Sequence, residues 1–249
     1  HSHNLPLIVD STVATPALLR PIRHGADIVV QSATKTLTTS GFGVCGAVIA
    51  RRNLVTSVPN DALKDDFALY IKYLPNRDYG PNLHPMQAIM TLNDMRTLRS
   101  KVDLMSRSTM KVAEYLEHHP KIESVQYLGL PIHPLHDLAS RYMWLVDAEH
   151  DEQYRRPVNR YGHLMSFCVA GGAEAARKMF DNLQRIWRAT DLGRIKSVAT
   201  IPAISTHQQQ GEEGRKLAHI PPNLIRLCVG AEHPDDIIND LEQALHKIS

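Results

Sequence analysis

The chain has 249 residues, of which 43% are hydrophobic, and its formal net charge at pH 7 is +2. This length usually makes one or two domains, and the near-neutral charge gives no electrostatic reason to expect nucleic-acid binding. No apolar run approaches the length of a membrane span, so no membrane association is expected.

The first hundred residues alternate between strand and helix signals. Short β-branched runs predict parallel strands over 5–10 and 27–31, joined by a brief crossover helix over 17–25. The run CGAVIA predicts a third strand over 45–50. Apolar residues at helical spacing then predict consecutive helices over 85–98 and 99–118.

The pattern changes beyond residue 120. Strands are predicted near 122–127, 164–169 and 224–229, and helices near 173–187 and 234–247. The change favours a boundary near residue 96, which divides the chain into a first domain of residues 1–95 and a second of residues 96–249.

The three cysteines show no metal-type spacing. Cys45, Cys168 and Cys228 each lie in an apolar, strand-like run. Such residues are typically buried free thiols, which suit a reducing compartment. The sequence therefore predicts no metal site and a cytoplasmic location.

Chemically useful side chains follow the first two strands. Asp10 ends the first run, and Ser32, Thr34 and Lys35 end the second. An acid, a lysine and hydroxyls at neighbouring strand ends are what a pyridoxal 5′-phosphate site needs. The lysine forms a Schiff base with the aldehyde, the acid holds the protonated ring nitrogen, and the hydroxyls bind the phosphate.

Three longer segments carry a family resemblance. They read VDSTVATPALLRPIRHGADIVVQSATK, RYGHLMSFCVAGGAEAARKMFDNL and PPNLIRLCVGAEHPDDIINDLEQAL. Together they resemble the Cys/Met-metabolism family of pyridoxal-phosphate enzymes, which includes O-acetylhomoserine sulfhydrylases, cystathionine γ-synthases and methionine γ-lyases. The resemblance covers nearly the whole chain, and only about 142–158 looks like a lineage-specific insertion.

The resemblance implies an α/β fold of the type I, aspartate aminotransferase-like class. Residues 1–95 would be the second half of the pyridoxal-phosphate-binding large domain, and residues 96–249 the C-terminal α+β domain. Lys35 would be the catalytic lysine, and Asp10, Thr12, Ser32 and Thr34 would complete the cofactor site, with Thr12 beside the ring.

The resemblance also implies a substrate site near the C-terminus. Arg226 would bind the α-carboxylate of an amino-acid substrate, as a bidentate guanidinium can. Thr206 would lie at the same pocket. Asp191 stands where the family has a serine, and a direct Asp191–Arg226 pair would neutralise the arginine and weaken carboxylate binding.

The implied activity is γ-replacement on O-acetyl- or O-succinylhomoserine by sulfide or a thiol, in methionine and cysteine metabolism. Two alternatives stay open. Elimination of the cystathionine or methionine lyase type uses the same early steps. A non-catalytic subunit that binds the cofactor would explain the altered substrate side.

The resemblance also implies an incomplete enzyme. The family places roughly half of its large domain upstream of the Asp10 strand, and a parallel sheet without those strands exposes an apolar edge and both faces. The expected partner is therefore the N-terminal half of the same enzyme, on a separate or continuous chain, within a homotetramer built as a dimer of dimers.

Overall fold

Two short parallel strands begin the fold in the computed structural model, which describes residues 1–248. β1 (Ile8–Asp10) pairs with β2 (Ile28–Ser32), and β2 pairs in the antiparallel sense with β3 (Gly46–Ala50), giving a three-stranded sheet in the order β1-β2-β3. The predicted parallel pair is confirmed, and the third strand runs against it.

The crossover between β1 and β2 is not the single helix that was predicted over 17–25. It consists of α1 (Thr15–Leu18) and the 3₁₀ turn η1 (Pro21–His24). Pro21 has no backbone N–H to continue a helix, and Gly25 ends the turn with a left-handed φ of 96°.

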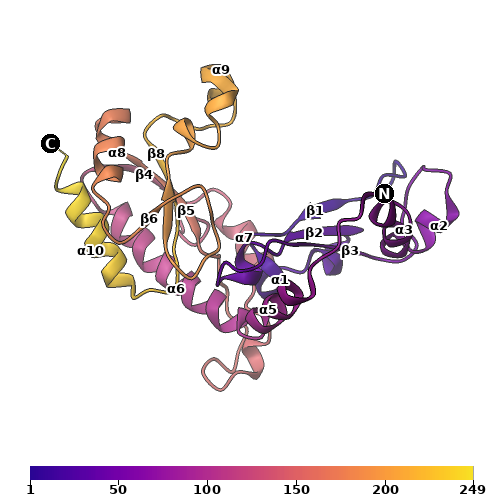
Figure 1. The fold of residues 1–249 in the computed structure, drawn as a ribbon. Helices are drawn as coiled ribbons and strands as arrows, with labels where there is room; N and C mark the ends of the chain where they lie inside the picture. The colour runs from indigo at the N-terminus through magenta and orange to yellow at the C-terminus, as the bar shows by residue number, and fades with distance from the viewer. Residues whose placement is uncertain (249) are drawn as a thin grey trace. The chain divides into compact units, whose positions relative to one another are not determined.

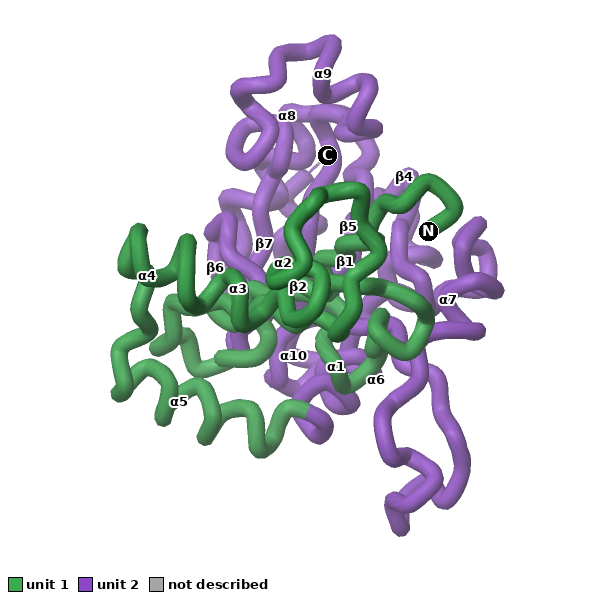
Figure 2. Tube along the Cα trace, turned by 90° about the vertical axis from the view of Figure 1, so that its right-hand side faces the viewer, with its two compact units in different colours: residues 1–98 green, residues 99–249 purple. Residues whose placement is uncertain are grey.

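Short helices complete the first part of the chain. They are η2 (Thr36–Thr38), α2 (Asp61–Asp65), α3 (Phe67–Tyr73), α4 (Pro75–Tyr79) and α5 (Pro85–Met95). Asn60 and Asp66 cap α2 and α3 by accepting backbone N–H groups. These elements belong to the first of two compact units, residues 1–98, and the second unit is residues 99–249 (Figure 1 and Figure 2).

The second unit is built around a five-stranded sheet in the order β4-β5-β8-β7-β6. Its strands are β4 (Ile122–Gln126), β5 (Leu164–Val169), β6 (Trp187–Arg188), β7 (Val198–Thr200) and β8 (Leu224–Cys228). The helical elements are α6 (Leu98–Glu117), α7 (His136–Tyr142), η3 (Ala148–His150), α8 (Gly172–Asp181), η4 (Pro202–Ile204), η5 (Gln208–Gln210), α9 (Gly211–Leu217) and α10 (Pro234–Leu245).

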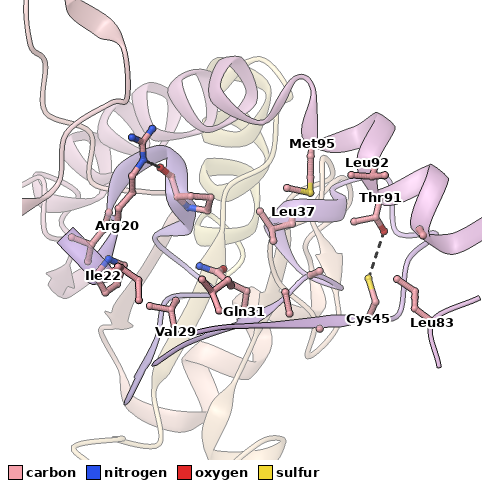
Figure 3. A pocket seen from close by; sticks show the side chains of 18 residues that line it. Arg20, Ile22, Val29, Gln31, Leu37, Cys45, Leu83, Thr91, Leu92 and Met95 are labelled. Atoms are coloured by element: carbon pink, nitrogen blue, oxygen red, sulfur yellow. Dashed lines mark hydrogen bonds between the residues drawn. The ribbon is translucent and has the colours of Figure 1, made fainter. Parts of the chain in front are cut away.

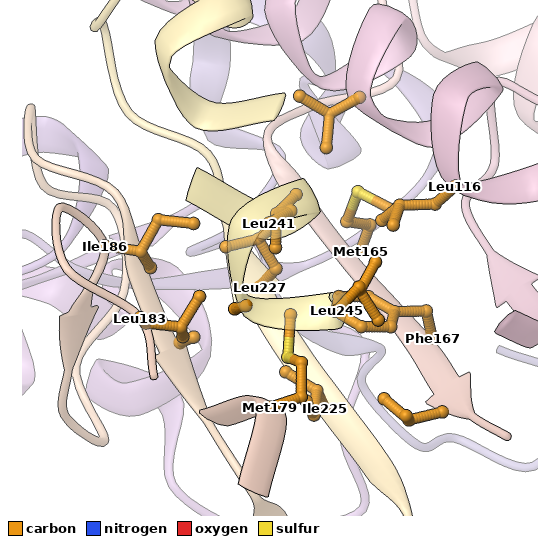
Figure 4. Close-up of a cluster of buried hydrophobic side chains, with 14 of the residues drawn as sticks. Leu116, Met165, Phe167, Met179, Leu183, Ile186, Ile225, Leu227, Leu241 and Leu245 are labelled. Atoms are coloured by element: carbon orange, nitrogen blue, oxygen red, sulfur yellow. The ribbon is translucent and has the colours of Figure 1, made fainter. Parts of the chain in front are cut away.

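The core of the second unit lies on one face of β5 and β8. Met165 and Phe167 on β5 lie opposite Leu227 and Ile225 of β8 (Figure 4), and Val169, on the same face of β5, belongs to the same buried cluster. Apolar side chains of α6, α8 and α10 belong to the same buried cluster. The strands predicted near 164–169 and 224–229 are therefore confirmed here.

Helix α8 ends earlier than the predicted helix over 173–187. It stops at Asp181, and the buried carboxylate of Asp240 then accepts the backbone N–H groups of Gln184, Arg185 and Ile186 at 2.8–2.9 Å. That carboxylate stabilises a non-helical turn, so the chain leaves the helix and enters β6.

The segment 142–158 is attached to α6 by a polar cluster. Buried Asp103 accepts hydrogen bonds of 2.5 Å from the Tyr154 hydroxyl and from Arg160 Nε. The Arg160 guanidinium also lies over the Tyr154 ring, 5.1 Å from its centre. Within residues 1–248, no helix has the length and hydropathy needed to cross a bilayer.

Candidate functional site

The carboxyl ends of β1 and β2 lie at the same edge of the sheet. Asp10, the last residue of β1, lies opposite Val30, and the Ser11 N–H donates to the Val30 carbonyl at 3.0 Å. Ligands of parallel α/β sheets bind outside this edge. The residues that follow both strands are therefore placed where a ligand can reach them.

Hydrogen bonds connect four of the predicted residues. The Thr12 N–H donates to Asp10 Oδ1 at 2.9 Å, and the Ser32 N–H donates to Thr12 Oγ1 at 2.8 Å. The Lys35 N–H in turn donates to the Ser32 carbonyl at 3.1 Å. The structure thus brings Asp10, Thr12, Ser32 and Lys35 into one continuous cluster at the strand ends.

Thr34 differs from its neighbours because its hydroxyl is already engaged. It donates to the Cys45 carbonyl at 3.1 Å and accepts the Cys45 N–H at 2.9 Å. This bridge ties the loop after β2 to the chain that enters β3. A hydroxyl has one proton, so the Thr34 side chain must turn before it can donate to a phosphate.

An aspartate that the sequence reasoning missed holds the next part of the loop. Asp94 of α5 accepts hydrogen bonds of 2.9 Å from both the Ser40 N–H and the Ser40 hydroxyl, and one of 3.2 Å from the Thr39 hydroxyl. The Thr-Thr-Ser run at 38–40 is visible in the sequence. Its acceptor on α5 was not visible in the sequence.

The donor set at this edge fits pyridoxal 5′-phosphate. Asp10 is exposed and uses Oδ1 for Thr12, which leaves Oδ2 open to a ring N–H. The half-buried Ser32 hydroxyl contacts no hydrogen-bond partner within residues 1–248, so it can donate to a phosphate. An acid, a hydroxyl donor and a half-exposed lysine thus lie together at the ends of two strands.

A cavity of about 580 Å³ lies on the other face of β2, entirely within the first unit (Figure 3). Its walls are almost wholly apolar and include Val29, Leu37, Leu92 and Met95. Gln31 also lines it, is 5% exposed, and has an Oε1 atom that finds no hydrogen-bond partner among the described residues 1–248. Since Gln31 and Ser32 alternate across the strand, this cavity is separate from the cofactor cluster.

Arg226 lies on β8 in the second unit and is half-buried. Its Nη2 donates to the backbone carbonyls of Thr190 at 2.8 Å and Asp191 at 3.2 Å. Burial lowers the pKa of Arg226, while the neighbouring Cys228 and Asp191 raise it. Nε and Nη1 make no hydrogen bond within residues 1–248, so the guanidinium keeps donors for an anion.

The expected direct pair between Asp191 and Arg226 is wrong. The Asp191 carboxylate accepts from Arg194 Nε at 2.5 Å and from the Leu192 N–H at 2.9 Å. Arg194, three residues along the chain, provides a closer cation than a residue on another strand. The sequence reasoning missed this role of Arg194, although the Asp-x-x-Arg spacing was readable.

Thr206 lies just after the turn that follows β7. It is exposed, and its hydroxyl lies 2.8 Å from His207 Nδ1. The neighbouring Ser205 hydroxyl lies 2.9 Å from that of Thr200, which is the cross-strand partner of Arg226. Two bonded hydroxyls thus link the strand position opposite Arg226 to the residue before Thr206.

Comparison with protein families identifies the chain. The model of the Cys/Met metabolism PLP-dependent enzyme family matches residues 1–246. Among curated relatives, the chain is 35% identical to an L-methionine gamma-lyase of Fusobacterium nucleatum and to an O-succinylhomoserine sulfhydrylase of Pseudomonas aeruginosa. Each match covers 98% of this chain but only 55% and 54% of the relative.

Solved structures give the same result. An O-acetylhomoserine (thiol)-lyase of Campylobacter jejuni, which contains a pyridoxyl-lysine monophosphate, superposes with a TM-score of 0.86 at 32% identity, over 98% of this chain and 60% of that one. A cystathionine gamma synthase of Xanthomonas oryzae gives 0.82 at 30% identity, over 97% and 55%. The chain thus spans just over half the length of these relatives, and it belongs to the Cys/Met metabolism family of PLP-dependent enzymes, with their type I fold.

Proposed function

We propose that this chain carries the lysine half of an active site that performs γ-replacement on O-acetyl- or O-succinylhomoserine, with sulfide or a thiol as the incoming group. The observation that carries the proposal is the hydrogen-bonded cluster of Asp10, Thr12, Ser32 and Lys35 at the carboxyl ends of two parallel strands. Its residue types match the needs of pyridoxal 5′-phosphate.

Each residue of the cluster has a defined task in this proposal. Lys35 holds the cofactor covalently, and its released Nζ then takes a proton from the substrate Cα and moves protons to later positions. Asp10 Oδ2 accepts the ring N–H and keeps that nitrogen protonated. Ser32, with Thr34 after rotation, donates to the phosphate, and Thr12 flanks the ring. The bound cofactor supplies an electron sink for the substrate carbanion.

Arg226 provides the substrate carboxylate site in this proposal. Its Nη2 is held by two backbone carbonyls, while Nε and Nη1 remain available as donors. A guanidinium fixed in this way can recognise the planar α-carboxylate of an amino acid. Thr206 contributes to the rim of the same site.

Elimination is the second candidate activity, and a specific observation favours it. Relatives named L-methionine gamma-lyase and O-succinylhomoserine sulfhydrylase are equally similar to this chain, at 35% identity. Supplying the complete protein with O-acetylhomoserine and sulfide, and separately with methionine, tests the choice. Homocysteine from the first mixture supports replacement, and methanethiol from the second supports elimination.

The active form includes a polypeptide equivalent to the part of the relatives that this chain does not span. The apolar cavity of the first unit and the unsatisfied Gln31 Oε1 support this proposal, because an apolar segment with one hydrogen-bond donor would satisfy both. We place the assembly, a dimer of dimers, in the cytoplasm, where the free thiols of Cys168 and Cys228 stay reduced.

Borohydride reduction of the complete, yellow protein tests the cofactor site. Reduction should fix a pyridoxyl group on the peptide that contains Lys35, and Lys35→Ala should abolish that adduct. Lys72→Ala, which removes a lysine of α3 in the same unit, should leave the adduct unchanged. A pyridoxyl group found on a different lysine of the wild-type protein would contradict the assignment.

A further inference from the structure

The side chain of Asp191 holds the turn of residues 190–194 through hydrogen bonds to residues of the same turn. Asp191 Oδ1 accepts the Leu192 N–H at 2.9 Å, and Oδ2 accepts Arg194 Nε at 2.5 Å. The side chains of Asp191 and Arg194 are only 29% and 17% exposed, so their ion pair is partly shielded from water. The carboxylate therefore fixes both the backbone and the following cation.

The same turn is also held by strand β8. The Gly193 N–H donates to Cys228 Sγ at 3.1 Å, and Gly193 adopts a φ of +78°, which favours glycine. Arg226 lies two residues before Cys228 and therefore on the same face of the strand. Its Nη2 binds the carbonyls of Thr190 and Asp191, the first two residues of the turn.

Two effects of Asp191 on Arg226 can now be separated. A direct pair would cancel the charge of the guanidinium, but the Asp191 carboxylate is already bound to Arg194. The contact that Asp191 makes with Arg226 is through its backbone carbonyl, which orients Nη2 without neutralising the charge. The two carbonyls therefore fix the orientation of the Nη2 end of the guanidinium.

We infer that Asp191 and Arg194 act as a single positioning unit, which fixes the 190–194 turn so that its carbonyls orient Arg226 toward the substrate carboxylate. This inference rests on the proposed role of Arg226. Neither residue touches the substrate; each acts through the turn. Loss of Asp191 weakens carboxylate binding, which is the opposite of the effect that charge competition gives.

The inference predicts how single and double variants relate. Asp191→Ser frees the turn and removes the carboxylate that pairs with Arg194. Arg194→Met frees the Asp191 carboxylate, which can then pair with Arg226 and compete with substrate. The double variant removes both charges, so its defect should be no larger than that of the worse single variant, as expected for two residues that act as one unit.

Steady-state kinetics of the complete protein with O-acetylhomoserine test this pattern. Asp191→Ser and Arg194→Met should each raise KM about 10-fold, the size of one lost charged contact, with kcat within about 2-fold of wild type. Arg194→Lys should keep KM near the wild-type value, because it preserves the cation. Arg185→Met, which removes an exposed pair with Asp236, is the matched control and should not change KM.

Hydrogen exchange gives a second measurement that does not depend on turnover. The amides of Leu192 and Gly193 should exchange faster in Asp191→Ser and Arg194→Met than in wild type, and not in Arg185→Met. Unchanged exchange, or a KM that falls in Asp191→Ser, overturns the inference. If the protein turns over no homoserine ester or methionine but these amides respond as expected, the proposed function fails while the pairing of the turn stands.

Discussion

The two units of this chain bury their apolar side chains to very different extents. In residues 99–249, apolar residues of α6, α8, α10 and the central strands form one continuous buried cluster. Residues 1–98 contain most of the large exposed apolar side chains, even though this is the shorter unit. The second unit thus buries a continuous apolar core, whereas the first exposes an apolar surface of the kind that often marks interaction sites.

The comparison separates two sources of stability. In the second unit, the apolar side chains are buried against one another within the chain, so they stabilise the fold directly. In the first unit, β1 has exposed Ile8 and Asp10, and a large apolar cavity adjoins β2 and β3. Its side chains are expected to contribute only once another polypeptide covers them.

The largest expected effect is in the core of the second unit. Phe167 is 1% exposed, and Phe167→Ala should lower the unfolding free energy of the chain by about 3–5 kcal/mol. Phe42→Ala removes the same ring from a position 65% exposed in the first unit and should change it by less than about 0.5 kcal/mol. Urea denaturation measures the unfolding free energy of both variants. Equal losses would contradict the difference in burial between the two units.

Asp240 provides the next largest effect. Asp240→Ala removes the acceptor of three backbone N–H groups, those of Gln184, Arg185 and Ile186. Leaving such donors unsatisfied should lower the unfolding free energy by about 2–4 kcal/mol. Asp240→Asn keeps one acceptor oxygen and should cost clearly less in the same urea titration; equal losses would mean that charge alone matters.

His163 should make the stability of the second unit depend on pH. Complete burial lowers the pKa of its imidazole from 6.5 to about 4, so the folded state holds it neutral. Between these two values the unfolded chain binds the proton and the folded chain does not. Stability should therefore fall as pH drops from 6.5 toward 4, by on the order of 2–3 kcal/mol.

A variant without the imidazole tests this assignment. His163→Phe should flatten the pH dependence of the unfolding free energy in this interval, whatever its effect at pH 7. A slope equal to that of wild type would assign the dependence to other groups.

The smallest expected effect sharpens the interpretation of the first unit. Ala47 lines the apolar cavity, and Ala47→Trp should fill part of it. The isolated chain should tolerate the change, but association with the polypeptide that completes the enzyme should weaken about 10-fold, or about 1.4 kcal/mol. Co-purification and sedimentation measure this; unchanged association would place the partner elsewhere.

The sequence predicted the elements whose signals are local and strong. The apolar runs 164–169 and 224–229 became β5 and β8 because their length and alternation fit central strands. The helices α2 to α4 were missed because each is only five to seven residues long and has no buried residue. Their sequences therefore lack the apolar periodicity that indicates a helix.

The candidate site also contains residues that the sequence could indicate and contacts that it could not. Asp10 and Lys35 could be proposed as neighbours because strand ends can be identified in the sequence and parallel strands share an edge. The bridge from Thr34 to Cys45 was not predictable, since it depends on how the chain enters β3. The partner of Asp191 was wrongly predicted because a cation three residues away was given less weight than one on a distant strand.

The attachment of residues 142–158 to α6 has an evolutionary consequence. Asp103 is buried, its carboxylate accepts from the Tyr154 hydroxyl and from Arg160, and Arg107 of the same helix lies 3.5 Å from it. A relative without this segment has no Tyr154, and an ancestor with Asp103 alone would have carried a buried acid short of one donor. Relatives that lack the segment are therefore expected to carry a neutral residue at the position of Asp103, and an alignment of the family would test this expectation.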